Sequence, residues 1–477
     1  MKLLEIQSDS CAKLPLIAQL KMLTWPKYAL LSIFIVGFIS RVFFIGTGSL
    51  WPDEALYLFI SRNLASDPTA LHNIDGKLFF QNPPLFLYVL SILFQVFSNS
   101  AVLAARFLNA LLGALTILLV YRIGKNQFGE GVGIIAATLL AVNPLHLWTS
   151  SRILMDVPVT FLIYLSIYFL SEGKKTFFYI SAAASCLTKY PALPLLVLPF
   201  LKEARIKNSP KFYSLLYFLG IGLMSLFIAL KVKPNMGILT ELLRFFGFPN
   251  YREMIHETSF FLSNIVLVFS LFGFFLCLKN KKINQLVLWF LLFGAARLFL
   301  PWMAFRMSRY TLPLYPALLL LASYGGLEMV RFLRKKFATR SLTINLLFAS
   351  FLFYVICISA SRAYMVTDLN ARTFVGFNEV QMVFKDKPPG LSIITASPRQ
   401  VKYYAPQMNV LDLSSESSHG QIQDLISQKQ IKYVMVDRWS PHQPRWAVGF
   451  FQSEKGFKPI YSSPNLIIYE TIRFAKP

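Results

Sequence analysis

The sequence predicts a mainly α-helical protein with about 11 membrane-spanning helices and a small α/β domain at its C-terminal end. Three observations predict this fold class. Of the 477 residues, 55% are hydrophobic and only 15% are charged, and the mean hydropathy is +0.52. The apolar residues come in runs of about 20, the length that spans a bilayer, separated by short basic loops. Residues 362–477 are polar instead and contain short β-rich runs.

The composition excludes a soluble enzyme, because a soluble domain carries about 25% charged residues. The net charge is +24, which in a soluble chain would suggest nucleic acid. In a membrane protein, Lys and Arg accumulate in cytoplasmic loops, so we favour topology as the cause and expect no nucleic-acid partner. The four cysteines include no CxxC pair, so neither a disulfide framework nor a zinc site is expected.

The apolar runs predict the spanning helices. The first run, residues 28–46, is expected to be a retained helix, because no small-residue cleavage site directly follows it. Later spans are predicted at residues 101–121, 132–148, 157–170, 212–230, 260–278, 285–300, 311–327 and 342–360. Each is about long enough to cross ~30 Å of hydrocarbon.

Two stretches are ambiguous, and the charges of the loops decide between topologies. Residues 84–97 are short and are interpreted as a juxtamembrane helix in the outer interface. Residues 177–201, interrupted at Lys189, are interpreted as a pair of short helices. All five basic loops then face the cytoplasm, as the positive-inside rule requires. The N-terminus is therefore expected in the cytoplasm of a multi-pass protein, most simply in the cell membrane.

This topology divides the chain into a transmembrane domain, residues 1–361, and an extracytoplasmic α/β domain, residues 362–477. In the latter, strands are predicted at residues 391–395, 409–413, 432–436 and 466–469, and a helix at residues 421–430. No GxGxxG or Walker A motif is present, so nucleotide binding has no support there. Most outer loops carry acidic residues, and the chemistry is therefore expected outside.

Asp53 and Glu54 directly follow the first helix, where an acidic pair at the lipid boundary is costly without a purpose. A carboxylate here can act as a general base on an acceptor hydroxyl, or can bind a metal. The alternative is that Asp53 is a helix N-cap. The spacing alone does not decide between them.

Two further outer segments carry acids. Asp156 opens the next helix at the outer side, where helix capping is again the alternative reading. His256 and Glu257 lie together in a third outer loop and could bind a divalent cation such as Mn, Mg or Zn, although such a pair is more often simply solvated.

Several cations lie near membrane depth, where each must pair, snorkel or serve a site. Arg306 and Arg309, with Tyr310, flank the outer end of a helix, and a lipid phosphate is the natural anion at that depth. For Arg41 and Arg106 we expect pairing or snorkelling to headgroups.

Taken in order, these segments resemble the C-type (GT-C) polyprenyl-phosphate-sugar glycosyltransferases. The similarity is to the branch of dolichyl-phosphate-mannose protein mannosyltransferases and aminoarabinose transferases of lipid A. The matching pieces are Asp53-Glu54, Asn82-Pro83-Pro84-Leu85, Ala105-Arg106-Phe107, Ser151-Arg152 to Asp156, Leu187-Thr188-Lys189 and Arg309-Tyr310-Thr311-Leu312-Pro313. Gln81 and Asn82 depart from the pattern, because the lipid A transferases have an acid and a lysine there.

The resemblance implies transfer of a sugar from a polyprenyl phosphate at the outer or luminal face. Asp53 would be the catalytic base and Asp156 a second active-site acid that orients acceptor or metal. Lys189, Arg309 and Tyr310 would bind the donor phosphate. The acceptor stays open between a protein, a glycan and a membrane lipid, and the sugar between a hexose and a pentose.

Two alternative functions from other classes remain open. Broken helices and buried cations also mark the substrate path of a secondary transporter. A GT-C scaffold without activity is the second alternative, and it would be favoured if Asp53 were dispensable.

Overall fold

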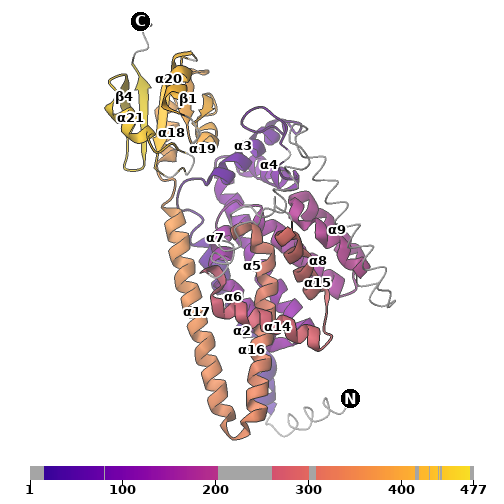
Figure 1. The fold of residues 1–477 in the computed structure, drawn as a ribbon. Coiled ribbons are helices and arrows are strands. Elements are labelled where there is room, and N and C mark those ends of the chain that lie inside the picture. Colours follow the sequence, from indigo (N-terminus) through magenta and orange to yellow (C-terminus); the bar gives the residue numbers. More distant parts are fainter. Residues whose placement is uncertain are drawn as a thin grey trace. The chain divides into compact units, whose positions relative to one another are not determined.

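The computed structural model describes residues 16–79, 81–201, 260–299, 308–413, 418–428, 430–438, 440 and 443–472. The chain forms two compact units, each assembled from segments that are separated in sequence (Figure 1). The first, here called the helical unit, contains Met1–Val42, Ala110–Ser150 and Asp156–Tyr364. The second, here called the mixed unit, contains Phe43–Asn109, Ser151–Met155 and Met365–Pro477. The predicted division at residue 361 falls inside a helix, α17, and as a statement about domains it stays a prediction.

The described part of the helical unit is a bundle. Its elements are α2 (Leu16–Val42), α6 (Glu130–Ala141), α7 (Pro144–Ser150), α8 (Asp156–Ser171), α9 (Lys175–Thr188), η2 (Tyr190–Val197), α14 (Asn264–Lys279), α15 (Gln285–Phe299), η4 (Ser308–Leu314), α16 (Tyr315–Lys336) and η5 (Ala338–Arg340). Two longer helices, α5 (Ala101–Phe128) and α17 (Ser341–Ala371), belong partly to each unit.

Three helical stretches among the described residues are long and apolar enough to cross a membrane: Leu85–Phe128, Arg309–Lys336 and Ala338–Ala371. A fourth is possible if α6 and α7 count as one bent span. Few apolar side chains of α17 are buried, as expected of a helix with a surface that faces lipid. The count of about 11 spans stays a prediction, and the one expected at residues 212–230 lies outside the described residues.

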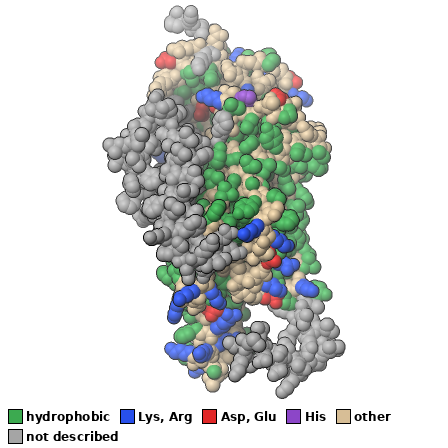
Figure 2. All heavy atoms as spheres, turned by 90° about the vertical axis from the view of Figure 1, so that its right-hand side faces the viewer, with side chains coloured by type: hydrophobic (Ala, Val, Ile, Leu, Met, Phe, Trp, Pro, Cys, Tyr) green, Lys and Arg blue, Asp and Glu red, His purple; other side chains and the backbone are tan. Residues whose placement is uncertain are grey.

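Exposed basic side chains gather at one end of the helical unit. The end of α16 and the turn into α17 carry exposed Arg334, Lys335, Lys336 and Arg340. Figure 2 shows Lys and Arg gathered at the lower end of the molecule, below a broad area of hydrophobic side chains. The cytoplasmic orientation of this end stays a prediction.

The span expected at residues 132–148 is bent in the structure, and whether it crosses the membrane as one span stays a prediction. Helices α6 and α7 meet at 60°, because Pro144 cannot continue the α6 hydrogen-bond ladder. Arg41, completely buried on α2, donates to the carbonyl oxygens of Leu140 and Ala141, both at 3.3 Å. The guanidinium therefore donates to backbone carbonyls at the break, so Arg41 pairs within the protein as expected.

The break predicted in residues 177–201 is present. Helix α9 ends at Thr188, Lys189 has extended backbone angles (φ −157°, ψ 132°), and η2 begins at Tyr190. Pro191 lies two residues after Lys189, and because it has no backbone N–H it cannot continue the hydrogen-bond ladder of α9. Lys189 therefore lies at a corner between two short helices.

A similar corner precedes α16. The hydroxyl of Tyr164 on α8 donates to the carbonyl of Pro313 at 3.0 Å and accepts from the amide of Ala317 at 2.9 Å. Pro313 and Ala317 would otherwise bond to each other across one turn, so Tyr164 is inserted into the helical ladder. Trp289 on α15 donates to the same carbonyl at 3.2 Å. These bonds fix η4, which carries Arg309 and Tyr310.

Helices α14 and α16 pack unusually closely at two glycines. A Cβ added to Gly273 would lie 2.0 Å from the carbonyl oxygen of Leu321, and one on Gly325 would lie 2.6 Å from that of Phe269. Small residues at such crossings let helix backbones approach, which is how helices associate in lipid.

The mixed unit combines α3 (Pro52–Ser66) and α4 (Leu85–Phe97) with a five-stranded sheet. Its strands are β1 (Ser392–Thr395), β2 (Asn409–Asp412), β3 (Tyr433–Asp437), β4 (Phe457–Ser462) and β5 (Leu466–Thr471). The helices of the same region are α18 (Phe377–Phe384), α19 (Pro398–Tyr404), α20 (His419–Gln428) and α21 (Ala447–Ser453). The strand order is β2-β1-β3-β5-β4, with the first three parallel and β5 antiparallel to β3 and β4.

The predicted α/β character of the C-terminal region is confirmed. The four predicted strands are present within two residues, as is the helix α20. All five residues of β3 are buried, with Tyr433 and Met435 in one apolar cluster and Val434 and Val436 in another. Strand β4 is missing from the prediction, because this edge strand contains Lys458 and Pro459 and has no clear alternation.

Candidate active site

The predicted site residues that the structure describes fall into two groups, one in each unit. The mixed unit holds Asp53 and Glu54. The helical unit holds Asp156, Lys189, Arg309 and Tyr310. Arg306, His256 and Glu257 lie outside the described residues.

Asp53 and Glu54 lie in the first turn of α3, which begins at Pro52. Proline is preorganised for this position, and acidic side chains in a first turn are stabilised by the helix dipole. The N-cap residue is Trp51, so the interpretation of Asp53 as an N-cap is wrong. Glu54 takes part in the cap instead, because its Oε2 accepts the amide proton of Trp51 at 2.9 Å.

Glu54 is completely buried and forms a two-point ion pair with Arg106 of α5. The distances are 2.9 Å from Nε to Oε1 and 3.1 Å from Nη2 to Oε2. The amide of Ile153 also donates to Oε1, at 2.9 Å. Burial alone would raise the pKa of Glu54, but the charges of Arg106 and Arg152 outweigh it and hold that pKa below its ordinary value. Glu54 is therefore ionised and fully engaged.

Arg106 also fixes the loop before α3. It donates to the carbonyl oxygens of Ile45 at 2.9 Å, Thr47 at 3.3 Å and Ser49 at 3.3 Å. The same loop needs Gly48, which has φ +71° and whose added Cβ would lie 2.3 Å from a carbonyl oxygen of α17. The pairing expected for Arg106 is confirmed, and its partner is the acid beside the predicted base.

Asp53 has a different environment, because its side chain stays 16% exposed. Its Oδ1 accepts a hydrogen bond of 2.6 Å from Nη1 of Arg399, the second residue of α19. Arg399 is not among the predicted site residues. Nothing in the sequence marks it, since Ser397-Pro398-Arg399 reads only as the start of a helix.

In the helical unit, the structure brings together four residues that the sequence analysis singled out. Lys189 Nζ lies 2.5 Å from Oδ1 of Asp156 and 4.6 Å from the ring centroid of Tyr310. The guanidinium of Arg309 lies 5.2 Å from the same ring, and its Nη2 is 3.5 Å from the Tyr310 hydroxyl. Lys189, Asp156 and Arg309 are buried, whereas Tyr310 is half-buried.

This group, here called the Lys189 cluster, combines residues from three elements. Asp156 opens α8, Lys189 is the corner between α9 and η2, and Arg309 and Tyr310 belong to η4. Figure 1 shows α8 and α9 side by side. With two cations and one carboxylate, the cluster carries a net positive charge, which suits an anion such as phosphate.

The described residues do not fit a divalent cation. Among them, no three His, Cys, Asp or Glu side chains come close enough to hold a metal. Asp53 and Asp156 are each paired with a cationic side chain instead. The metal expected at His256 and Glu257 stays a prediction, and we derive no chemical step through it.

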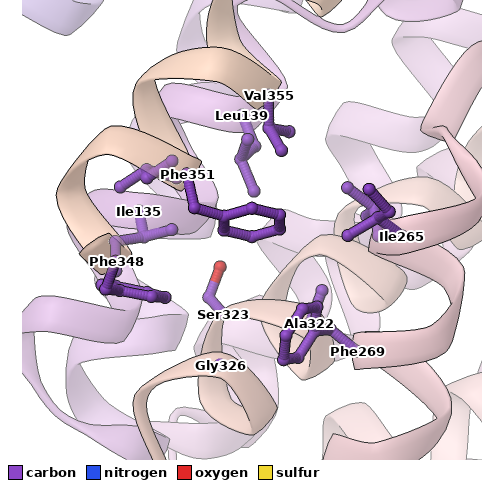
Figure 3. Close-up of a pocket in the computed structure, with 12 residues that line it drawn as sticks. Ile135, Leu139, Ile265, Phe269, Ala322, Ser323, Gly326, Phe348, Phe351 and Val355 are labelled. Carbon is purple, nitrogen blue, oxygen red and sulfur yellow. The ribbon is translucent and has the colours of Figure 1, made fainter. Parts of the chain in front are cut away.

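An apolar groove elsewhere in the helical unit offers no reactive groups. It lies among α6, α14, α16 and α17, with side chains such as Leu139, Phe269 and Phe351 pointing into it (Figure 3). Ser323 contributes the one polar side chain of its lining, and that hydroxyl donates to the Leu319 carbonyl at 2.7 Å.

Comparison with known proteins agrees with the motif resemblance. Residues 81–233 match the family model described as dolichyl-phosphate-mannose-protein mannosyltransferase. No curated protein matches this sequence.

Three solved structures are similar to the chain over most of its length. One is ArnT from Cupriavidus metallidurans bound to undecaprenyl phosphate, with TM-score 0.57 and 14% identity over 94% of this chain and 98% of that one. Another is the archaeal oligosaccharyltransferase AglB from Archaeoglobus fulgidus in complex with an inhibitory peptide and a dolichol-phosphate, with TM-score 0.59 and 11% identity over 96% and 75%. The third is the arabinofuranosyltransferase AftD from Mycobacteria, with TM-score 0.52 and 15% identity over 94% and 40%.

At these identities the likeness shows the fold. The chain has the fold of the GT-C polyprenyl-phosphate-sugar glycosyltransferases, as the ordered motifs predicted.

Proposed function

We propose that this protein is a membrane glycosyltransferase that moves a sugar from a polyprenyl phosphate to a hydroxyl acceptor. The observation that carries the proposal is the Lys189 cluster, in which residues predicted separately for the donor phosphate come together beside Asp156. The similar ArnT structure holds undecaprenyl phosphate, and AglB holds a dolichol-phosphate, which supports a lipid-phosphate donor.

The reaction is a displacement at the anomeric carbon. The acceptor oxygen forms the new bond to that carbon as the bond to the phosphate oxygen breaks, and the configuration inverts. Asp53 takes the proton of the acceptor hydroxyl, and the polyprenyl phosphate leaves with the bonding electrons. Its 16% exposure leaves the Asp53 carboxylate within reach of a substrate.

The leaving phosphate gains negative charge in the transition state. Lys189 and Arg309 are fixed cations that stabilise this charge, and they act strongly because they are buried from water. Asp156 holds the Lys189 ammonium in place through their 2.5 Å contact. Both carboxylate oxygens of Glu54 are bonded to Arg106, and we assign Glu54 the role of positioning α3. Arg306 stays a candidate for the same phosphate.

The acceptor is a protein, a glycan or a membrane lipid, and the transferred group is a hexose or a pentose. We place the reaction at the extracytoplasmic or luminal face, following the predicted topology.

The test is consumption of donor by the purified protein in lipid, with polyprenyl phosphates that carry labelled mannose, glucose or pentose and with acceptor extracts. Asp53→Asn is expected to reduce turnover by about 10² to 10⁴-fold. Asp67→Asn, an exposed acid at the other end of α3, is the matched control and should retain activity.

Equal consumption by wild type and Asp53→Asn would overturn the assignment of the base. No consumption of any donor would overturn the proposed function, and would favour a transporter or an inactive scaffold.

A further inference from the structure

Helix α19 of the C-terminal α/β region places a charged side chain against Asp53, the predicted base. Arg399 of α19 donates from Nη1 to Asp53 Oδ1 at 2.6 Å, although the two residues are 346 positions apart in the chain. Their side chains are 35% and 16% exposed, so both stay reachable from solvent. Both residues belong to the mixed unit.

Helix α19 is packed against α3 and does not merely touch it. The guanidinium of Arg62 lies 4.4 Å from the ring centroid of Tyr403, and its Nη1 is 3.5 Å from the Tyr403 carbonyl. Tyr403 shares an apolar cluster with Leu56 and Ile60 of α3. The contact that carries the Arg399 ion pair is therefore an ordered interface.

The other end of α19 is tied to the sheet. The hydroxyl of Ser397, directly before α19, donates to Asp437 Oδ2 at 2.8 Å. Asp437 ends β3, is 1% exposed, and also accepts from the amide of Ser440 at 2.7 Å. A continuous series of contacts thus runs from β3 through α19 to the carboxylate of Asp53.

We propose that Arg399 is a positioning residue that orients Asp53 for proton transfer, so that the C-terminal domain completes the reaction centre. The proposal rests on the proposed role of Asp53 as the base. A general base is commonly held in place by a third group, and a guanidinium suits a carboxylate because it stays charged at every working pH. Its contact with Oδ1 restrains one carboxylate oxygen and so limits the orientations that the Asp53 side chain can adopt.

The first test compares Arg399→Gln and Arg399→Lys with Arg372→Gln in the donor-consumption assay. Arg372 is the matched control, because it is an arginine of the same unit, 74% exposed, paired with Asp368. We expect Arg399→Gln to lower kcat by about 10²-fold, the effect of a misplaced catalytic group, with KM for the donor unchanged. Arg399→Lys should recover part of the loss, and Arg372→Gln should behave as wild type.

The second test does not depend on activity. Thermal unfolding of wild type, Asp53→Asn, Arg399→Gln and the double variant forms a cycle, and the two substitutions should be non-additive because they remove the same contact. Additive effects would overturn the ion pair and with it the proposal.

A normal or raised kcat in Arg399→Gln would also overturn the proposal, and a raised value would identify the pair as an inhibitory latch. If wild type consumes no donor while the unfolding cycle shows coupling, the proposed function fails, whereas the Asp53–Arg399 contact stands without a role in that reaction.

Discussion

Asp53 and Glu54 are consecutive carboxylates in one helical turn, yet they meet opposite surroundings. Glu54 is completely buried, and both of its oxygens are engaged by Arg106, with further amide donors. Asp53 is partly exposed and meets Arg399 through one nitrogen and one oxygen in a 2.6 Å contact. Successive helical side chains point about 100° apart, so one acid faces the interior and the other does not.

The difference shows how a fold can hold a reactive acid. A base must be able to exchange partners, so it cannot be saturated by buried donors. The neighbouring acid can be saturated, and it then fixes the turn that presents the base. Substitution of each acid in turn tests this division of roles between Asp53 and Glu54.

The largest expected effect on stability comes from Glu54→Gln. The substitution leaves Arg106 buried without its countercharge, and breaking a buried pair in this way lowers the free energy of unfolding by about 3–5 kcal/mol. Asp53→Asn should lower it by less than about 1 kcal/mol, because its pair is partly exposed. Unfolding of both variants in detergent, followed by circular dichroism, measures the difference.

The double variant Glu54→Gln/Arg106→Gln is the control, since it removes both charges and should be more stable than Glu54→Gln alone. Similar losses for Asp53→Asn and Glu54→Gln would show that the two acids do not differ in the way we describe.

A smaller effect is expected when the Lys189 cluster loses its ammonium. Lys189→Gln removes a fixed cation from the proposed phosphate site and should lower kcat/KM for the donor by about 10²-fold. Lys174→Gln, an exposed lysine just before α9, is the control and should change little. Undiminished turnover in Lys189→Gln would remove this residue from the donor site.

Much of this arrangement could be predicted from the sequence because it depends on local signals. Apolar runs predicted the helices, and the segment Lys189-Tyr190-Pro191 predicted the break between α9 and η2. Alternating β-rich runs predicted four of the five strands. The residues of the Lys189 cluster were found individually, because charged groups at membrane depth require a purpose.

The pairings could not be predicted, because they depend on packing between distant segments. Arg106 could have paired with any nearby acid, and only the fold places it against Glu54 instead of Asp53. Arg399 is 346 positions from its partner and lies in a region read only as an α/β domain. Likewise, Pro144 causes the bend between α6 and α7. The bend was not predicted, because residues 132–148 were interpreted from their apolar composition alone.

The smallest expected effect is on the pH dependence of stability. It compares wild type, in which Glu54 is ionised, with Glu54→Gln, in which the side chain is uncharged. The pKa of Glu54 in the folded protein lies below its ordinary value of 4.5. Ionised Glu54 therefore adds stability that is fully present above the unfolded-state pKa and is lost as the pH falls through the folded-state pKa. The free energy of unfolding of wild type should decrease as the pH falls below about 4.5, and Glu54→Gln should lack this part of the decrease. The gap between the two proteins should thus narrow toward low pH, and a gap that stays constant down to pH ~2 would mean that Glu54 is not stabilised as a carboxylate.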